Sequence, residues 1–103
     1  MEIRSDKIKI MSLNQTSATE KAKRDLAKRA GVAESDVETI SVEETDFPDM
    51  SLGATVSDEM AAQMISTGWR INLRADGKNY EYRADKYQLR LCNHKGTNHI
   101  IEL

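Results

Sequence analysis

Three side chains that could ligate a metal or act as nucleophile and base lie close together near the C-terminal end. They are Cys92, His94 and His99, in the spacing Cys-x-His-x4-His. A structural zinc site needs four ligands, and a catalytic one needs three and an open position. No Cys-x-x-Cys pair accompanies them, and no helix N-terminus follows Cys92 to lower the pKa of its thiol. We therefore interpret Cys92 as a residue at the end of a strand and the two histidines as residues of the turn that follows it. A metal-binding or thiol-dependent protein is the alternative.

Other catalytic motifs are absent from the sequence. It has no P-loop and no Gly-x-Gly-x-x-Gly, His-Glu-x-x-His or Gly-x-Ser-x-Gly motif. Asp46 and Asp49 lie in an acidic stretch but lack the ligand periodicity of a Ca²⁺ loop. We therefore expect no enzyme activity, no metal and no cofactor.

Residues 45–56 form the preferred candidate for a binding surface, because their Pro and Gly predict a loop. The candidate binding residues in it are Phe47, Pro48, Asp49, Ser51, Leu52 and Gly53. An aromatic ring, a proline that fixes φ and a flexible glycine suit a contact loop on a rigid scaffold. The alternative is a loop that packs onto the core through Phe47 and Leu52.

A set of arginines shares one face of the sheet predicted for the last third of the chain. The set is Arg70, Arg74, Arg83 and Arg90, with Lys78 and Lys86 at the turns. Sheets that bind nucleic acid combine such charge with exposed aromatic rings. Trp69, Tyr80 and Tyr82 have the opposite parity, so we expect them to face a helix and the basic face to be solvated. Arg70 and Arg83 join the candidate binding residues, and a nucleic-acid binder using this face is a further alternative.

One helix is predicted in the N-terminal third. Ser17 to Glu20 has the spacing of a capping box, and apolar residues recur every four positions through residues 18–30. Gly31 then suits the left-handed position that ends a helix. Before it, Lys7 to Ile10 alternates with period two, so residues 1–14 are predicted to be a flexible or edge-strand N-terminus.

The remaining pattern is that of strands. Residues 37–44 predict a strand with Ile40 and Val42 on one face, whereas residues 57–66 fit either a short helix or an irregular crossing. Alternation over residues 69–75, 80–84 and 87–91 predicts a three-strand meander with a type I′ turn at Asp76-Gly77, and residues 100–101 could add an edge strand. The fold class is therefore α+β: residues 15–103 form a single domain in which one helix packs on a four- to five-stranded antiparallel sheet.

Composition limits the remaining possibilities. The chain has 103 residues, 39% apolar, which suffices for one domain with a small core. Residues 32–66 hold nine acidic and no basic side chains, while both flanking parts are net basic, and the net charge is -2. No apolar run approaches the ~20 residues of a membrane span. A single cysteine cannot form an intrachain disulfide. The N-terminus lacks the apolar region of a secretory signal. We expect a cytoplasmic protein with no nucleic-acid or membrane partner. The sequence leaves the oligomeric state open, and we favour a monomer.

Five segments of the chain form a recognisable series: Val42-Glu43, Phe47-Pro48-Asp49-Met50-Ser51-Leu52-Gly53-Ala54, Gly68-Trp69-Arg70-Ile71, Tyr80-Glu81-Tyr82-Arg83 and Leu91-Cys92. This series resembles small bacterial proteins, often exported, whose function is unassigned. Ala54 stands where that pattern has cysteine, and Arg83 where it has histidine. The resemblance implies that positions 54 and 92 lie close together in the fold. The order of helix and meander is also similar to PepSY-type domains, which are associated with binding and restraint of peptidases.

These observations favour a small non-enzymatic binding or regulatory domain. Its partner would be another protein or a peptide, contacted through an exposed sheet edge or through the loop that begins at Phe47.

Overall fold

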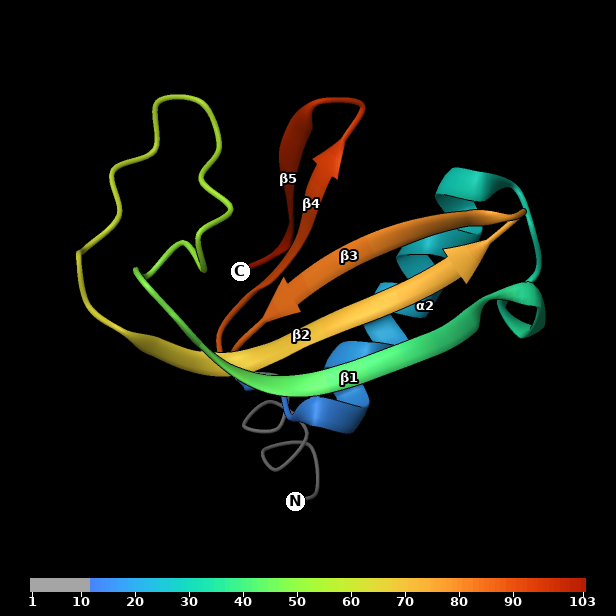
Figure 1. The fold of residues 1–103 in the computed structure, drawn as a ribbon, viewed down its shortest axis with the longest axis horizontal. Coiled ribbons are helices and arrows are strands. Elements are labelled where there is room, and N and C mark those ends of the chain that lie inside the picture. The colour runs from blue at the N-terminus through green and yellow to red at the C-terminus, as the bar shows by residue number, and fades with distance from the viewer. Residues whose placement is uncertain (1–11) are drawn as a thin grey trace, which may run out of the picture.

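The computed structural model describes residues 12–103 as one helix followed by a five-stranded sheet (Figure 1). The elements are α2 (Gln15–Ala30), a short 3₁₀ turn (Glu34–Asp36), β1 (Glu38–Phe47), β2 (Ser66–Ala75), β3 (Lys78–Ala84), β4 (Leu89–His94) and β5 (Thr97–Glu102). Neighbouring strands are antiparallel, and their spatial order follows the chain order from β1 to β5. The predicted α+β class is confirmed, including the added strand at the C-terminal end. The edge strand suggested for Lys7 to Ile10 lies outside the described residues.

Helix α2 begins three residues earlier than the sequence predicts. Its N-cap is Asn14, whose side chain accepts a hydrogen bond from the Ser17 amide at 2.8 Å. The Ser17 hydroxyl in turn accepts from the Asn14 amide at 2.9 Å. Ser17 is therefore the third helical residue of a capping box and not the cap, so the predicted start is wrong. The predicted end is confirmed, because Gly31 has a φ of 71° and donates its amide to Ala27.

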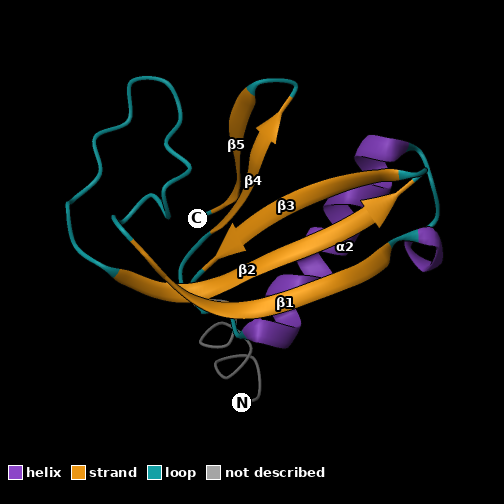
Figure 2. Cartoon of the chain, in the orientation of Figure 1, coloured by secondary structure: helices purple, strands orange, loops and turns teal. Residues whose placement is uncertain are grey.

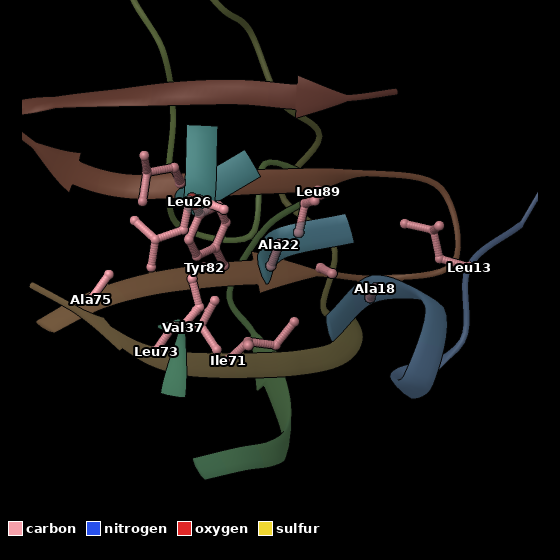
Figure 3. Close-up of a cluster of buried hydrophobic side chains, with 13 residues drawn as sticks. Leu13, Ala18, Ala22, Leu26, Val37, Ile71, Leu73, Ala75, Tyr82 and Leu89 are labelled. Carbon is pink, nitrogen blue, oxygen red and sulfur yellow. The ribbon is translucent and has the colours of Figure 1, made fainter. Parts of the chain in front are cut away.

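The hydrophobic core lies between α2 and one face of the sheet, which we call the inner face (Figure 3). The helix contributes Ala18, Ala22 and Leu26, all fully buried, and the two alanines allow close approach to the strands. Tyr82 is also fully buried, and its hydroxyl donates to the Asp25 carboxylate of α2 at 2.7 Å. Trp69 and Tyr80 pack against the same core. The prediction that Trp69, Tyr80 and Tyr82 face the helix is thus confirmed. Tyr87, which belongs to the predicted strand segment 87–91, instead precedes β4 and is 65% exposed.

Strand β1 extends to Phe47, beyond the predicted end at residue 44, and contains a bulge. The pairing register shifts between Thr39 and Ser41, so Ile40 is an extra residue. Ile40 is 51% exposed, whereas Val42 packs against the core. The expectation that Ile40 and Val42 share one face is wrong, because the extra residue interrupts the alternation between them.

Residues 48–65, here called the β1–β2 loop, contain no helix or strand. Figure 2 shows this long loop at one end of the sheet, with α2 behind the strands. Of the two possibilities left open for residues 57–66, the irregular crossing is the one found. Asp76 and Gly77 both have positive φ, at 52° and 75°, which confirms the predicted type I′ turn. Within residues 12–103, no helix has the length and apolar character needed to cross a bilayer.

Candidate functional site

Three arginines stand side by side across the outer face of the sheet, opposite to α2. Arg70 on β2 pairs in register with Arg83 on β3, which pairs with Arg90 on β4. Glu43 of β1 stands next to Arg70 in the same row. Like charges directly opposite each other destabilise a sheet. The row therefore needs neighbouring groups that compensate its positive charge.

Arg83 holds the first part of the β1–β2 loop. Its Nη1 donates to the Leu52 carbonyl at 2.8 Å, and its guanidinium lies 5.5 Å from the centre of the Phe47 ring. Arg70 lies 6.0 Å from the same ring. Both arginines also donate through Nε to one carboxylate oxygen of Glu81, at 2.7 Å from Arg83 and 3.1 Å from Arg70. The Glu81 carboxylate and the face of the Phe47 ring thus both compensate the positive charge of the two arginines.

Arg90 holds the second part of the loop and is 2% exposed. Its two terminal nitrogens donate to the two carboxylate oxygens of Glu59 at 2.6 and 2.5 Å. Nη1 also donates to the Ala54 carbonyl, and Nε to the side chain of Gln88. This bidentate pair lowers the pKa of the Glu59 carboxyl below its ordinary value, chiefly through the hydrogen bonds from Arg90.

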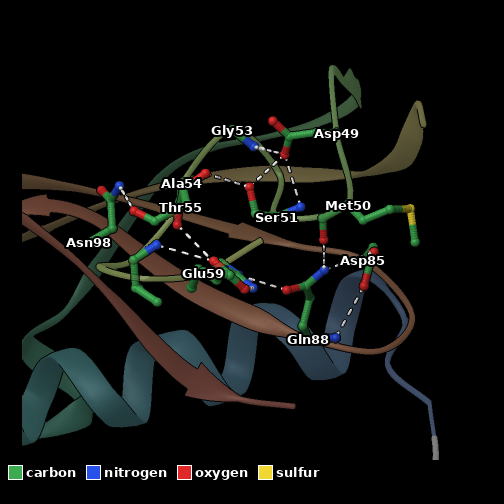
Figure 4. Close-up of polar contacts among 12 residues, drawn as sticks. Asp49, Met50, Ser51, Gly53, Ala54, Thr55, Glu59, Asp85, Gln88 and Asn98 are labelled. Atoms are coloured by element: carbon green, nitrogen blue, oxygen red, sulfur yellow. Dashed lines mark hydrogen bonds and ion pairs between the residues drawn. The ribbon is translucent and has the colours of Figure 1, made fainter. Parts of the chain in front are cut away.

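The turn at the start of the loop is organised by Asp49 (Figure 4). One of its carboxylate oxygens accepts from the Ser51 hydroxyl at 2.6 Å, the Ser51 amide at 2.9 Å and the Gly53 amide at 3.1 Å. These bonds lower the pKa of Asp49, and the Ser51 hydroxyl contributes most. Gly53 has a φ of 68°, and a Cβ added there would lie 2.8 Å from Nη1 of Arg83. The turn therefore needs both the aspartate and the glycine.

A second anchor joins the loop to the turn between β3 and β4. Gln88 donates to the Met50 carbonyl at 2.7 Å (Figure 4). The Met50 amide donates to the Ala62 carbonyl at 3.0 Å. Asp85, 3% exposed, accepts from the hydroxyl of Ser66, where the loop ends. The loop is thus bonded at its start, along its length and at its end.

The β1–β2 loop also exposes several large apolar side chains. Eight large apolar side chains are exposed among residues 12–103, and four of them belong to this loop. A fifth, Tyr87, lies in the β3–β4 turn beside Gln88. We call these five the apolar loop surface: Met50, Met60, Met64, Ile65 and Tyr87. In Figure 4 the Met50 side chain points away from the polar contacts. Such a concentration of exposed apolar groups on one segment is typical of a contact surface.

Cys92, His94 and His99 do not form one site. Cys92 pairs with Glu81 on the outer face, whereas the His94 ring contacts the rings of Tyr80 and His99 at 5.9 and 5.6 Å between centres. Asn93 between them has a φ of 49°, which breaks the alternation. Within residues 12–103, no three His, Cys, Asp or Glu side chains gather in a way that could hold a metal ion. Burial also raises the pKa of the Cys92 thiol to about 11, so a thiolate nucleophile is disfavoured at neutral pH.

A cavity of about 450 Å³ opens where β3 and β4 separate. Its lining includes Lys78 and Lys95 at the two turns, with Tyr80, Cys92 and His94 between them. Pairing of the two strands stops at Glu81 and Cys92, so the cavity arises from the divergence of the β4–β5 hairpin. Burial and the nearby positive charge of Arg29 lower the pKa of His94, which favours a neutral imidazole here.

The structure brings the predicted binding residues together on the outer face. Three of them are almost completely buried there: Phe47, Ser51 and Leu52. These side chains support the loop, and only the exposed residues beside them are free to contact a partner. Pro48 and Gly53 are exposed, Asp49 is half-buried, and Arg70 and Arg83 lie beneath the loop.

The expectation of a solvated basic face is wrong at Arg90, because the loop folds over it. Glu59, Gln88 and the apolar loop surface are not among the residues predicted from the sequence. The alternation of β4 identified the face on which Arg90 lies, but no local pattern indicated what covers it.

Fold and site together define a small α+β domain in which an arginine row holds a long loop on the open face of an antiparallel sheet. The chain belongs to the family described as domain of unknown function DUF8738, which matches residues 19–92. The matched region includes most of α2, the loop and the arginine row. No curated protein and no solved structure matches the chain significantly.

Proposed function

We propose that this domain is a non-enzymatic protein-binding module that contacts its partner through the apolar loop surface. The observation that carries the proposal is a loop that is bonded to the sheet along its length and exposes four large apolar side chains. Met60 is 97% exposed, Ile65 72%, Tyr87 65% and Met64 63%. Leaving such groups in water is unfavourable by about 25 cal/mol per Å² of apolar area, and a partner would remove that cost. Methionine side chains adapt to differently shaped partners, which suits a binding surface.

The charge around this surface defines the chemistry of the partner. The β1–β2 loop contains three acidic residues and no Lys or Arg. Asp46, just before the loop, and Asp58 within it are exposed. Complementary charge steers association and suppresses wrong partners. The partner segment is therefore apolar with basic residues at its borders.

Selection from a displayed library of random peptides, with the full chain as bait, tests the proposal. We expect enrichment of peptides that combine aromatic or aliphatic residues with Lys or Arg. The double substitution Met64→Ser and Tyr87→Ser should weaken the binding of the selected peptides at least about tenfold, which is a loss of ~1.4 kcal/mol in binding free energy. Ile40→Ser is the matched control, since Ile40 is exposed to a similar extent but lies on β1. No enrichment, or weakening by Ile40→Ser alone, would contradict the proposal.

A further inference from the structure

The cavity between β3 and β4 has a free stretch of strand backbone along one wall. The turn between β2 and β3 has two residues, so Ala75 and Lys78, which flank it, form a hydrogen-bonded pair. Such pairs alternate along an antiparallel ladder, so the next residue, Asn79, directs its amide and carbonyl away from β2 and towards β4. Pairing of β3 with β4 ends at Glu81 and Cys92, two residues short of Asn79. Among the described strands, none therefore pairs with Asn79 on its cavity side.

The opposite wall is the β4–β5 hairpin, which turns away from β3 beyond this last pair (Figure 1). Its residues are bonded to each other and not to β3. His94 pairs with Thr97 of β5, and the amide of Asn93 donates to the side chain of Asn98 at 2.8 Å. The two strands thus leave a gap of about 450 Å³ in the sheet. This volume lies within the range of about 300–1,000 Å³ that is typical of ligand sites.

The gap is flanked by two positive charges that lack a counter-ion. Lys78 and Lys95 line the gap, and both are exposed. Neither forms an ion pair in the described part of the chain. Glu81 also lines the gap, but its carboxylate accepts hydrogen bonds from Arg70 and Arg83, so its negative charge is already compensated. The potential in the gap is therefore positive and favours an acidic ligand.

We propose that the gap between β3 and β4 binds an extended segment of an acidic peptide, which adds a short strand to β3. The backbone of the peptide pairs with the amide and carbonyl of Asn79, and its acidic side chains lie near Lys78 and Lys95. Addition of a strand to free strand backbone is an established mode of peptide recognition, in which main-chain hydrogen bonds provide affinity. The apolar loop surface takes a partner of the opposite charge, so this inference goes beyond the proposed function and does not depend on it.

A blocked pentapeptide of the sequence Glu-Val-Glu-Val-Glu, added to the full chain and followed by NMR, tests the proposal. We expect saturable binding and slower hydrogen exchange of the Asn79 amide. Exchange at Tyr80 should not change, because its amide already points towards β2. Lys78→Glu and Lys95→Glu should each weaken binding at least about fivefold. Lys86→Glu is the matched control, since Lys86 is exposed in the turn at the other end of β4.

Two further arms separate strand addition from other kinds of binding. The uncharged peptide Gln-Val-Gln-Val-Gln should bind at least about tenfold more weakly. Inorganic phosphate should not protect the Asn79 amide; if it does so as well as the peptide, the gap is a simple anion site and the proposal is wrong.

The proposal is also overturned if the acidic peptide does not bind, if it binds without protecting the Asn79 amide, if both peptides bind equally, or if Lys86→Glu weakens binding as much as Lys95→Glu. Met64→Ser with Tyr87→Ser should leave binding of the acidic peptide unchanged. A loss in that variant would place the peptide on the apolar loop surface and would likewise contradict a site between β3 and β4.

Discussion

Arg90 of β4 binds both carboxylate oxygens of Glu59, a residue 31 positions earlier in the chain. The pair joins a strand in the middle of the sheet to the far part of the β1–β2 loop. Because Arg90 is 2% exposed, the contact is largely removed from water. It explains how a segment without helix or strand keeps one position on the sheet.

Removing the arginine side of this pair should destabilise the protein strongly. Arg90→Met leaves Glu59, the Ala54 carbonyl and Gln88 without their donor. Breaking a buried ion pair typically costs about 3–5 kcal/mol, and we expect the lower end because Glu59 is 21% exposed. Urea unfolding measures the loss, with exposed Arg74→Met as the control. Arg90→Lys should not restore stability, because an ammonium lacks the planar pair of donors. A loss below about 1 kcal/mol would show that the pair is unimportant.

Acid should release the loop before it unfolds the core. The pKa of Glu59 is lowered by Arg90, and the pKa of Asp49 is lowered by Ser51 and Gly53. A group whose pKa is lowered by folding stabilises fully above its ordinary pKa, here 4.5 for Glu59 and 3.8 for Asp49. That contribution is lost as pH falls through the lower folded values.

The Met50 and Met64 methyl signals should therefore stay constant between pH 7 and 5 and change below about pH 4.5. Glu59→Gln should remove part of this dependence and lower stability at neutral pH. A change centred near pH 6.5, where histidine titrates, would contradict the assignment.

Gly68 should be intolerant of any side chain. A Cβ at this position of β2 would lie 1.9 Å from the Ala84 carbonyl oxygen, which belongs to the backbone of β3 and cannot move away easily. Overpacking of this kind costs about 1–3 kcal/mol. Thermal unfolding of Gly68→Ala measures the cost, and Ser57→Ala in the exposed part of the loop serves as a neutral control. An unchanged melting temperature would show that the two strands can separate at this point.

Ala54→Cys should form a disulfide with Cys92 in oxidising buffer. The Ala54 carbonyl accepts from Arg90, two residues before Cys92 on the same face of β4. Closing a loop of 37 intervening residues would stabilise by roughly 3–4 kcal/mol in the chain-entropy model. Mass spectrometry and melting with and without reductant check it. Persistent free thiols would indicate Cα atoms beyond the ~7 Å that a disulfide allows.

Much of the fold could be predicted because it depends on local patterns. Alternation around Asp76-Gly77 defined the hairpin, and Gly31 defined the end of α2. The bulge at Ile40 escaped prediction because one extra residue leaves no mark in a short alternating segment. The covering of Arg90 escaped for a different reason: it depends on the contact with Glu59, and one sequence carries no signal for contacts between segments so far apart.

The contacts of the β1–β2 loop also suggest how the domain would behave if its chain were cut within this loop. Met60 and Ala62 are exposed residues in the middle of the β1–β2 loop. A break after Met60 would leave α2, β1 and Glu59 in one fragment and β2 to β5 with Arg90 in the other. Pairing of β1 with β2, the helix-covered core and the Arg90–Glu59 contact all cross that break. We therefore expect two separately produced pieces to associate through these contacts.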